Sequence, residues 1–115
     1  MEVVKLESKF YEEDKLLEIR ILEEIDHHYA NKMRRRIDSE IEKYIPKKIV
    51  FDFNNVTFMD SAGIGMLLGR YKLSRVICAE IELINVASSV KRILEMCGIT
   101  RIIKVIDAKK NVEVS

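Results

Sequence analysis

The chain is short of the residues that cross-link or interrupt structure. Its 115 residues include one proline, two cysteines, four glycines and no tryptophan. Cys78 and Cys97 lie too far apart for a CxxC motif, so neither a disulfide framework nor a cysteine-rich metal site is indicated. We therefore expect two free thiols in a reducing compartment. With no linker or low-complexity tract, the length predicts one domain over residues 1–115.

An excess of charge of one sign is also absent, as are long apolar runs. Lys and Arg number 20 against 19 Asp and Glu, a net charge of +1, which argues against nucleic acid or a membrane surface as a partner. No apolar run approaches the ~20 residues that span a bilayer. The N-terminal segment lacks the apolar block of a signal peptide, so we expect a cytoplasmic protein. The basic run 34–36 precedes Asp38, Glu40 and Glu42, which favours a solvated, salt-paired helix face.

Apolar periodicity predicts alternating strands and helices. The strands expected from alternating or continuous apolar runs cover residues 3–10, 15–22, 47–53, 80–86 and 101–107. Three helices are expected between them, the first capped by Asp26 and stopped near Pro46, the second starting at Ser61, and the third capped by Ser88 or Ser89. This order predicts an α/β fold: a small mixed β-sheet, mostly parallel, with an antiparallel first strand at its edge and helices packed on it. Residues 107–115 are expected to form a loose tail.

Each predicted helix has one apolar face. The apolar stripe of the first helix comprises Ala30, Met33, Ile37, Ile41 and Tyr44, and the helical pattern of the second comprises Ile64, Leu67, Leu68 and Tyr71, with Tyr44 and Tyr71 expected at the core edge. In the third helix Val90, Ile93, Leu94 and Cys97 are expected to face inward. Gly98 is expected just beyond the third helix, in the position where a left-handed residue commonly ends a helix.

Three of the four glycines fall within "FMDSAGIGMLLGRYK", residues 58–72. Ser61 lies where a strand gives way to a helix, and a helix N-terminus favours negative charge. Gly63 and Gly65 weaken the first turn by about 1 kcal/mol each relative to alanine. Such a turn suits close approach of another surface. With Phe58, Met59 and Ile64 nearby, the stretch predicts a docking surface around a modifiable hydroxyl. The alternative is that Ser61 only caps the helix and the glycines only allow tight packing.

Known catalytic and ligand-binding motifs do not fit this stretch. A nucleophile elbow needs glycine where Met59 stands. The glycine spacing is one residue too long for a dinucleotide fingerprint, and a P-loop would need Gly-Lys-Ser/Thr. His27 and His28 are the only histidines, and adjacent helical side chains diverge by about 100 degrees, which makes a poor metal pair. We expect no enzyme, cofactor or metal, and keep a small enzyme using Ser61 or Asp60 as a competing hypothesis.

The stretch "NNVTFMDSAGIGMLLGRYK" closely resembles the signature of the anti-sigma-factor antagonists, the bacterial members of the STAS domain family. "EIDHHYA" and "ASSVKRILEMCGITRII" extend this resemblance over most of the chain, and it is most similar to the sporulation type. The resemblance implies a single STAS domain without enzymatic activity. It implies an anti-sigma factor as partner, itself an ATP-dependent serine kinase that brings the nucleotide. Binding of the unphosphorylated form would release the sigma factor, phosphorylation of Ser61 would block binding, and a serine phosphatase would restore it.

Motif positions also imply a partner surface. Asp26, Asp60, Ala62, Gly63 and Ile64 match positions on or beside it, and the docking argument above adds Met59. Two departures from the family pattern are Glu23, where a glycine is usual, and Ala62, where a second serine is frequent. An alternative keeps Ser61 but assigns the chain to a general stress-response partner-switching pathway with a different kinase.

Overall fold

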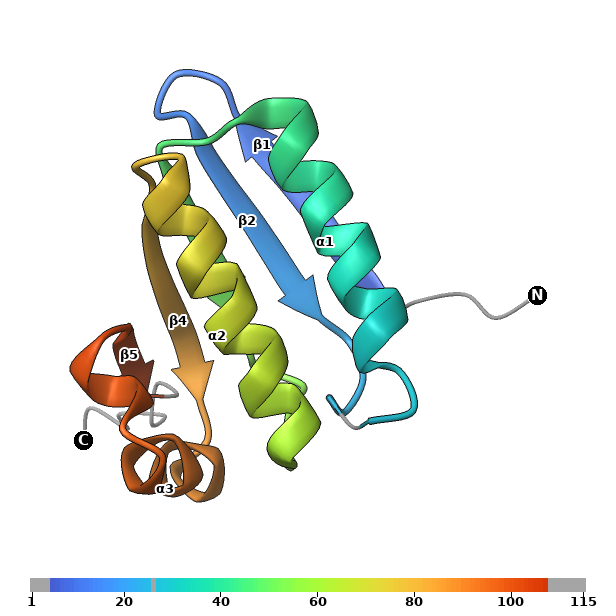
Figure 1. Ribbon diagram of the computed structural model, residues 1–115, viewed down its shortest axis with the longest axis vertical. Helices are drawn as coiled ribbons and strands as arrows, with labels where there is room; N and C mark the ends of the chain where they lie inside the picture. Colours follow the sequence, from blue (N-terminus) through green and yellow to red (C-terminus); the bar gives the residue numbers. More distant parts are fainter. Residues whose placement is uncertain (1–4, 26, 108–115) are drawn as a thin grey trace, which may run out of the picture.

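The computed structural model describes residues 5–25 and 27–107, which form one sheet with helices packed on it (Figure 1). The elements in chain order are β1 (Leu6–Tyr11), β2 (Leu16–Ile21), α1 (Ala30–Tyr44), β3 (Lys48–Asp52), α2 (Ser61–Val76), β4 (Glu80–Val86), α3 (Ser88–Met96), the 3-10 turn η1 (Ile99–Arg101) and β5 (Lys104–Asp107). This order confirms the predicted alternation. Val3, Val4, Asp26 and the tail 108–115 lie outside the described residues.

The sheet is mixed, as predicted. Its strands lie in the order β1-β2-β3-β4-β5, with β1 antiparallel to β2 and the remaining neighbours parallel. A tight turn joins β1 to β2, closed by the Lys15 amide donating to the Glu12 carbonyl at 3.4 Å. Such a short connection can only reverse the chain, whereas the helix between each later pair of strands allows a parallel crossover.

The core lies between the sheet and α1 and α2, which run side by side over one face (Figure 1). Inward side chains alternate along the strands, as in Leu17, Ile19 and Ile21 of β2, all of them completely buried. On α1, Ala30, Met33, Ile37 and Ile41 are buried and Tyr44 packs at the core edge, which confirms the predicted stripe. The opposite face of the sheet carries charged side chains, among them the ion pair of Lys48 with Glu82 at 3.1 Å.

The start of α1 differs from the prediction. The helix begins at Ala30, with Tyr29 in the cap position and no side-chain hydrogen bond to its first turn. The predicted start near Asp26 is therefore wrong by several residues. The physical reason is that the segment before α1 makes contacts across the fold: the His27 amide donates to Asp60 at 3.2 Å, and Ile25 pairs with Met59.

On α2 the predicted apolar pattern is confirmed. Leu67 is buried, and Ile64, Leu68 and Tyr71 are partly buried against the core, Tyr71 at its edge as expected. Met66, Arg70 and Ser74 are buried as well, and Arg70 pairs with Asp38 of α1.

In α3, Ala87 occupies the cap position and no side chain bonds to the first turn, so the predicted cap at Ser88 or Ser89 is wrong. Cys97 lies just beyond the helix, which ends at Met96, and is exposed instead of facing inward. Gly98 follows with the expected left-handed backbone, φ +77°.

The last strand is shorter than predicted. The structure places η1 over residues 99–101 and starts β5 only at Lys104. Ile99 in η1 and Ile103 just after it are buried. The apolar residues at these positions therefore pack a turn against the core and do not belong to a strand. Asp107 belongs to β5, so the expected loose tail does not begin at residue 107.

Candidate functional site

Two loops meet at the carboxyl ends of β2 and β3. Residues 22–29 follow β2 and residues 53–60 follow β3. They are joined by an isolated parallel bridge between Ile25 and Met59, whose side chains are 0% and 2% exposed. This bridge extends the pairing of β2 with β3 beyond the sheet, so the chain enters α2 from a fixed direction.

Asp60 caps α2. Its Oδ1 accepts hydrogen bonds from the amides of Ala62 at 3.0 Å and Gly63 at 3.1 Å, and its Oδ2 accepts one from the His27 amide at 3.2 Å. These backbone bonds, that of Gly63 foremost, hold the pKa of the Asp60 carboxyl below its ordinary value. One carboxylate thus satisfies free N–H groups of the helix and ties the helix to the β2–α1 loop.

Ser61 is the first residue of α2 and is exposed. The reading of Ser61 as merely the helix cap is wrong, because Asp60 supplies that cap. The Ser61 side chain therefore lies at the positive end of the helix dipole and faces solvent. A hydroxyl in this position is accessible to an incoming protein active site.

Glu24, in the loop after β2, binds the loop after β3 through hydrogen bonds. Its carboxylate accepts hydrogen bonds from the Thr57 amide at 3.0 Å, the Thr57 hydroxyl at 2.6 Å and the Phe58 amide at 2.7 Å. Each loop therefore offers a carboxylate to backbone N–H groups of the other. We call Glu24, Asp60 and the groups that they bind the carboxylate clasp.

Sequence reasoning did not single out Glu24. The signal available to it was a carboxylate in "EEIDHH", a loop at the carboxyl end of a predicted parallel strand, where side chains from neighbouring loops meet. The partner atoms are 33 and 34 residues away along the chain. No local pattern points across that distance.

Two of the residues expected on the partner surface are buried. Met59 is 2% exposed and Gly63 is also buried. A Cβ atom at Gly63 would lie 2.6 Å from Met59 Cγ and 2.8 Å from the Ile25 carbonyl oxygen. Both residues are used in packing the loops against α2, and their place on or beside a partner surface stays a prediction.

Gly65 has the opposite environment. It is exposed, and a Cβ atom there would meet nothing within 4 Å. It borders a groove of about 380 Å³ between the start of α1 and the first turns of α2. The groove is lined by His27, Ala30, Asn31, Arg34, Ala62, Gly65 and Met66. Close approach of another surface, which sequence reasoning assigned to both glycines, suits Gly65 alone.

The remaining predicted residues lie around Ser61. Ala62 and Ile64 are half-buried on α2, and Phe58 in the preceding loop is 53% exposed. The His27 side chain is 86% exposed, and its Nδ1 lies 3.9 Å from Asp60 Oδ2. Asp26 lies outside the described residues. The surface thus combines the exposed aromatic ring of Phe58, the first turn of α2 with its small residues, and the exposed Ser61 hydroxyl, which suits protein docking more than small-molecule chemistry.

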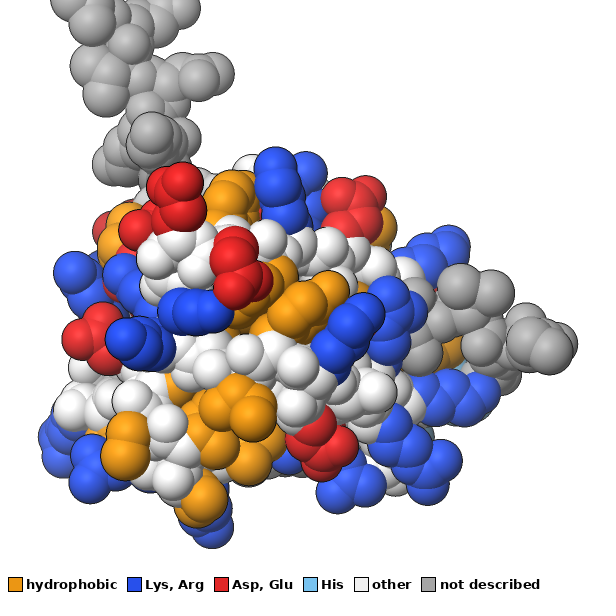
Figure 2. Space-filling view, turned by 90° about the horizontal axis from the view of Figure 1, so that it is seen from above, with side chains coloured by type: hydrophobic (Ala, Val, Ile, Leu, Met, Phe, Trp, Pro, Cys, Tyr) orange, Lys and Arg blue, Asp and Glu red, His pale blue; other side chains and the backbone are white. Residues whose placement is uncertain are grey.

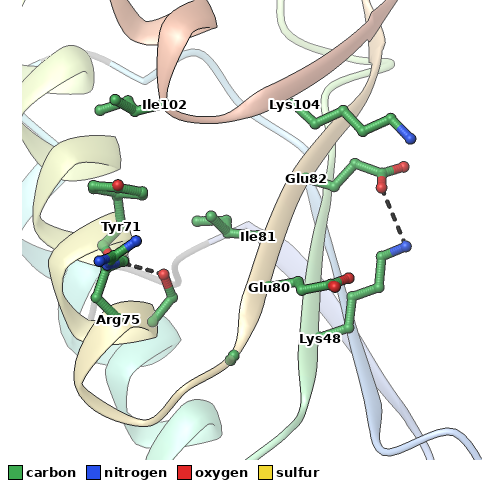
Figure 3. Close-up of a pocket in the computed structure, with 10 residues that line it drawn as sticks. Lys48, Tyr71, Arg75, Glu80, Ile81, Glu82, Ile102 and Lys104 are labelled. Atoms are coloured by element: carbon green, nitrogen blue, oxygen red, sulfur yellow. Dashed lines mark hydrogen bonds and ion pairs between the residues drawn. The ribbon is translucent and has the colours of Figure 1, made fainter.

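Another cleft lies at the other end of α2 (Figure 3). It measures about 500 Å³ and lies between the C-terminal half of α2, the first residues of β4 and Ile102, which follows η1. Its charged side chains carry both signs, and Lys48 is paired with Glu82. The buried Ser74 hydroxyl donates to the Tyr71 carbonyl at 2.6 Å and so needs no ligand. We assign no function to this cleft.

Basic, acidic and apolar side chains are interspersed on the face that lies at the C-terminal end of α2 (Figure 2).

Within residues 5–25 and 27–107, no three His, Cys, Asp or Glu side chains are grouped to hold a metal ion. In the same part of the chain, no helix combines the length and hydrophobicity needed to cross a bilayer.

Comparison with known proteins gives consistent results. The anti-sigma F factor antagonist of Paenibacillus polymyxa is 35% identical over 96 residues, which cover 84% of this chain and 82% of the relative. An anti-sigma-B factor antagonist of Listeria monocytogenes is 30% identical over 98 residues, covering 84% and 81%. The solved structure of the anti-sigma factor antagonist SpoIIAA in its unphosphorylated form superposes with a TM-score of 0.76 at 24% identity, over 92% of this chain and 90% of that one.

The family assignment covers nearly the whole chain. The family model described as the STAS domain matches residues 7–112, from within β1 to beyond β5. The mixed sheet with its antiparallel edge strand agrees with the fold of SpoIIAA. The chain belongs to the STAS domain family.

Proposed function

We propose that this chain is an anti-sigma-factor antagonist that is switched by phosphorylation of Ser61. The unphosphorylated form binds an anti-sigma factor, a serine kinase, and so releases a sigma factor. The observation that supports this most is the exposed hydroxyl of Ser61 on the first turn of α2. The carboxylate clasp joins the two loops beside this turn and fixes the start of the helix. The relatives named anti-sigma factor antagonists support the same role.

The proposed switch is electrostatic. A phosphate on Ser61 adds about −1.5 to −2 charges at neutral pH. It would stand next to the Asp60 carboxylate, whose oxygens already bind three backbone N–H groups. Within the free protein the helix N-terminus offsets part of this repulsion. At the interface, the phosphate would face a kinase site that holds nucleotide phosphates. Each 1.4 kcal/mol of repulsion there weakens binding about tenfold.

The burial of Met59 and Gly63 changes the set of residues that we propose for the partner surface. We propose that Asp60, Ala62 and Ile64 remain on or beside it, together with Asp26, while Met59 and Gly63 support it from below. Gly65 and the exposed Phe58 join the surface. The lack of a side chain at Gly65 lets a partner backbone approach α2 beside Ser61.

We propose that the pathway regulates sporulation transcription, on the support of an anti-sigma F factor antagonist that is 35% identical. Another relative of that name is 27% identical, and the anti-sigma-B factor antagonist is 30% identical. The alternative is a general stress-response partner-switching pathway with the same Ser61 and a different kinase. In either pathway the chain is a binding protein in the cytoplasm and not an enzyme, and a serine phosphatase reverses the modification.

The experiment is an intact-mass spectrum after incubation with Mg-ATP and a purified anti-sigma factor kinase of the same organism. The variants are Ser61→Ala and, as a matched control, Ser88→Ala. Ser88 is also exposed and is also the first residue of its helix, α3. We expect one phosphate on the wild type and on Ser88→Ala, and none on Ser61→Ala. An unmodified wild type in the presence of an active kinase would contradict the proposal.

A further inference from the structure

We propose that Glu24 is a positioning residue for the modification of Ser61. It touches neither the hydroxyl nor the helix that carries it. It holds the segment that leads into that helix, so that the kinase meets an ordered surface. This inference rests on the proposed function, because it names the residue that prepares the same site.

The contacts of Glu24 are concentrated on one short segment. Its two carboxylate oxygens accept hydrogen bonds from the Thr57 amide, the Thr57 hydroxyl and the Phe58 amide, at 2.6 to 3.2 Å. Hydrogen bonds to an ionised carboxylate are about twice as strong as neutral ones. Thr57 and Phe58 are exposed, so without Glu24 their amides would turn to water. The segment would then keep only the long 3.4 Å hydrogen bond from the Ser89 hydroxyl to the Thr57 carbonyl.

A carboxylate strengthens these bonds. An ionised Glu only accepts hydrogen bonds, and its two oxygens accept from the Thr57 hydroxyl and from the amides of Thr57 and Phe58. A glutamine in the same place can keep its oxygen for the two amides and donate its NH₂ group to the Thr57 hydroxyl, which also accepts. Glu24→Gln therefore keeps size and shape but replaces charge-assisted hydrogen bonds by neutral ones about half as strong.

The contacts that do not involve Glu24 determine how far the disorder extends when Glu24 is changed. Met59 stays bridged to Ile25, and Asp60 stays bound to the amides of α2 and of His27. The start of α2 therefore keeps its cap when Glu24 is changed, and the disorder is limited to Thr57 and Phe58. Phe58 is 53% exposed and lies three residues before Ser61, so its loss of order falls on the docking surface.

The energetic consequence is a cost of binding. A partner that docks on a disordered segment must order it first, which weakens association without changing the chemical step. Glu24→Gln should therefore raise the KM of the kinase for this chain and leave kcat nearly unchanged. Simple destabilisation of the fold does not produce this pattern while nearly all molecules remain folded.

Glu23 provides the matched control. It is the same residue type, next in the chain, and its carboxylate pairs with Lys5 Nζ at 3.4 Å, away from the segment before α2. Glu23→Gln removes the same charge from the same loop. It should leave both the order of residues 57–58 and the phosphorylation kinetics as they are in the wild type.

The test has two readouts on Glu24→Gln, Glu23→Gln and the wild type. The first is amide hydrogen exchange followed by NMR, with Phe51 in β3 as an internal reference. The second is the steady-state phosphorylation of Ser61 by the same anti-sigma factor kinase. In Glu24→Gln we expect exchange of the Thr57 and Phe58 amides to be about tenfold faster and KM to rise about tenfold, with kcat within about twofold.

Wild-type exchange at Thr57 and Phe58 in Glu24→Gln, or an unchanged KM, would overturn the proposal. An equal effect of Glu23→Gln would overturn it as well, since charge alone would then explain the result. If the wild type takes no phosphate, the proposed function fails and the kinetic half of this inference fails with it. The exchange of Thr57 and Phe58 still decides in that case whether Glu24 orders the segment.

Discussion

A Cβ atom at Gly63 would lie only 2.8 Å from the carbonyl oxygen of Ile25. The backbone of α2 and the loop after β2 are therefore as close as glycine permits. Gly63→Ala should lower the free energy of unfolding by about 1–3 kcal/mol, because the loops must move apart. Urea unfolding followed by circular dichroism measures this change.

Gly65→Ala is the control, two residues along the same helix. Its Cβ meets nothing within 4 Å, and alanine is favoured over glycine in a helix by about 1 kcal/mol. We expect this variant to be more stable than the wild type and to bind the anti-sigma factor more weakly. Equal stability of the two variants would contradict the different environments assigned to these glycines.

Asp60 gives the fold a dependence on acid pH. Its backbone hydrogen bonds lower the pKa in the folded state below the ordinary value of 3.8. A group with a lowered folded pKa contributes stability above its unfolded pKa and loses that contribution as the pH falls through the folded pKa. Asp60→Asn should therefore show a flatter fall in stability below about pH 4. Parallel acid-unfolding curves for Asp60→Asn and the wild type would count against this assignment.

The ion pair between α1 and α2 should respond unequally to removal of its two members. Arg70 Nε lies 2.8 Å from Asp38 Oδ1, and the exposed fractions of the side chains are 7% and 29%. Burial raises the pKa of Asp38 and lowers that of Arg70, so desolvation opposes the attraction in both. The Arg70 Nη1 atom is buried without a hydrogen-bond partner among the described residues.

Asp38→Asn would leave a buried guanidinium without its counter-ion, and should cost about 2–4 kcal/mol of unfolding free energy. Arg70→Met replaces the buried charge by an apolar chain and leaves a carboxylate that reaches solvent, so it should cost about 1 kcal/mol or less. Urea titrations of both variants measure the difference. A larger loss in Arg70→Met than in Asp38→Asn would reverse the argument.

Both thiols should react in the folded protein. Cys78 and Cys97 are free and exposed. Iodoacetamide should modify both under native conditions, at rates close to those measured in urea, because exposure limits thiol reactivity. Mass spectrometry of the alkylated chain counts the modified residues. Protection of Cys97 would instead restore the inward orientation expected from the helical periodicity of α3.

The fold could be predicted to the extent that local patterns determine it. The apolar stripe Ala30, Met33, Ile37 and Ile41 needs only the helical period, and the antiparallel first pair needs only a short turn. Gly98 was placed correctly because a left-handed residue after a helix favours glycine. These features depend on neighbours within a few residues.

The candidate site depends on contacts across the chain, and here prediction was partial. The motif singles out Ser61, and this assignment stays a prediction. Gly63 and Gly65 are the same residue type with opposite surroundings. The packing of Met59 and Ile25 against α2 separates them. Glu24 was missed because its hydrogen-bond partners lie 33 and 34 residues away. The cap at Asp26 was assigned from residue type, without the loop pairing that delays α1 to Ala30.

The most direct test of the account compares the affinity of the anti-sigma factor for this chain before and after phosphorylation of Ser61, by isothermal titration calorimetry. We predict that phosphorylation weakens binding at least about 100-fold, which corresponds to about 2.8 kcal/mol. Ser61→Ala should bind like the unphosphorylated chain and should not respond to the kinase and ATP. Equal affinity of the phosphorylated and unphosphorylated chains would contradict the central claim that Ser61 is the switch.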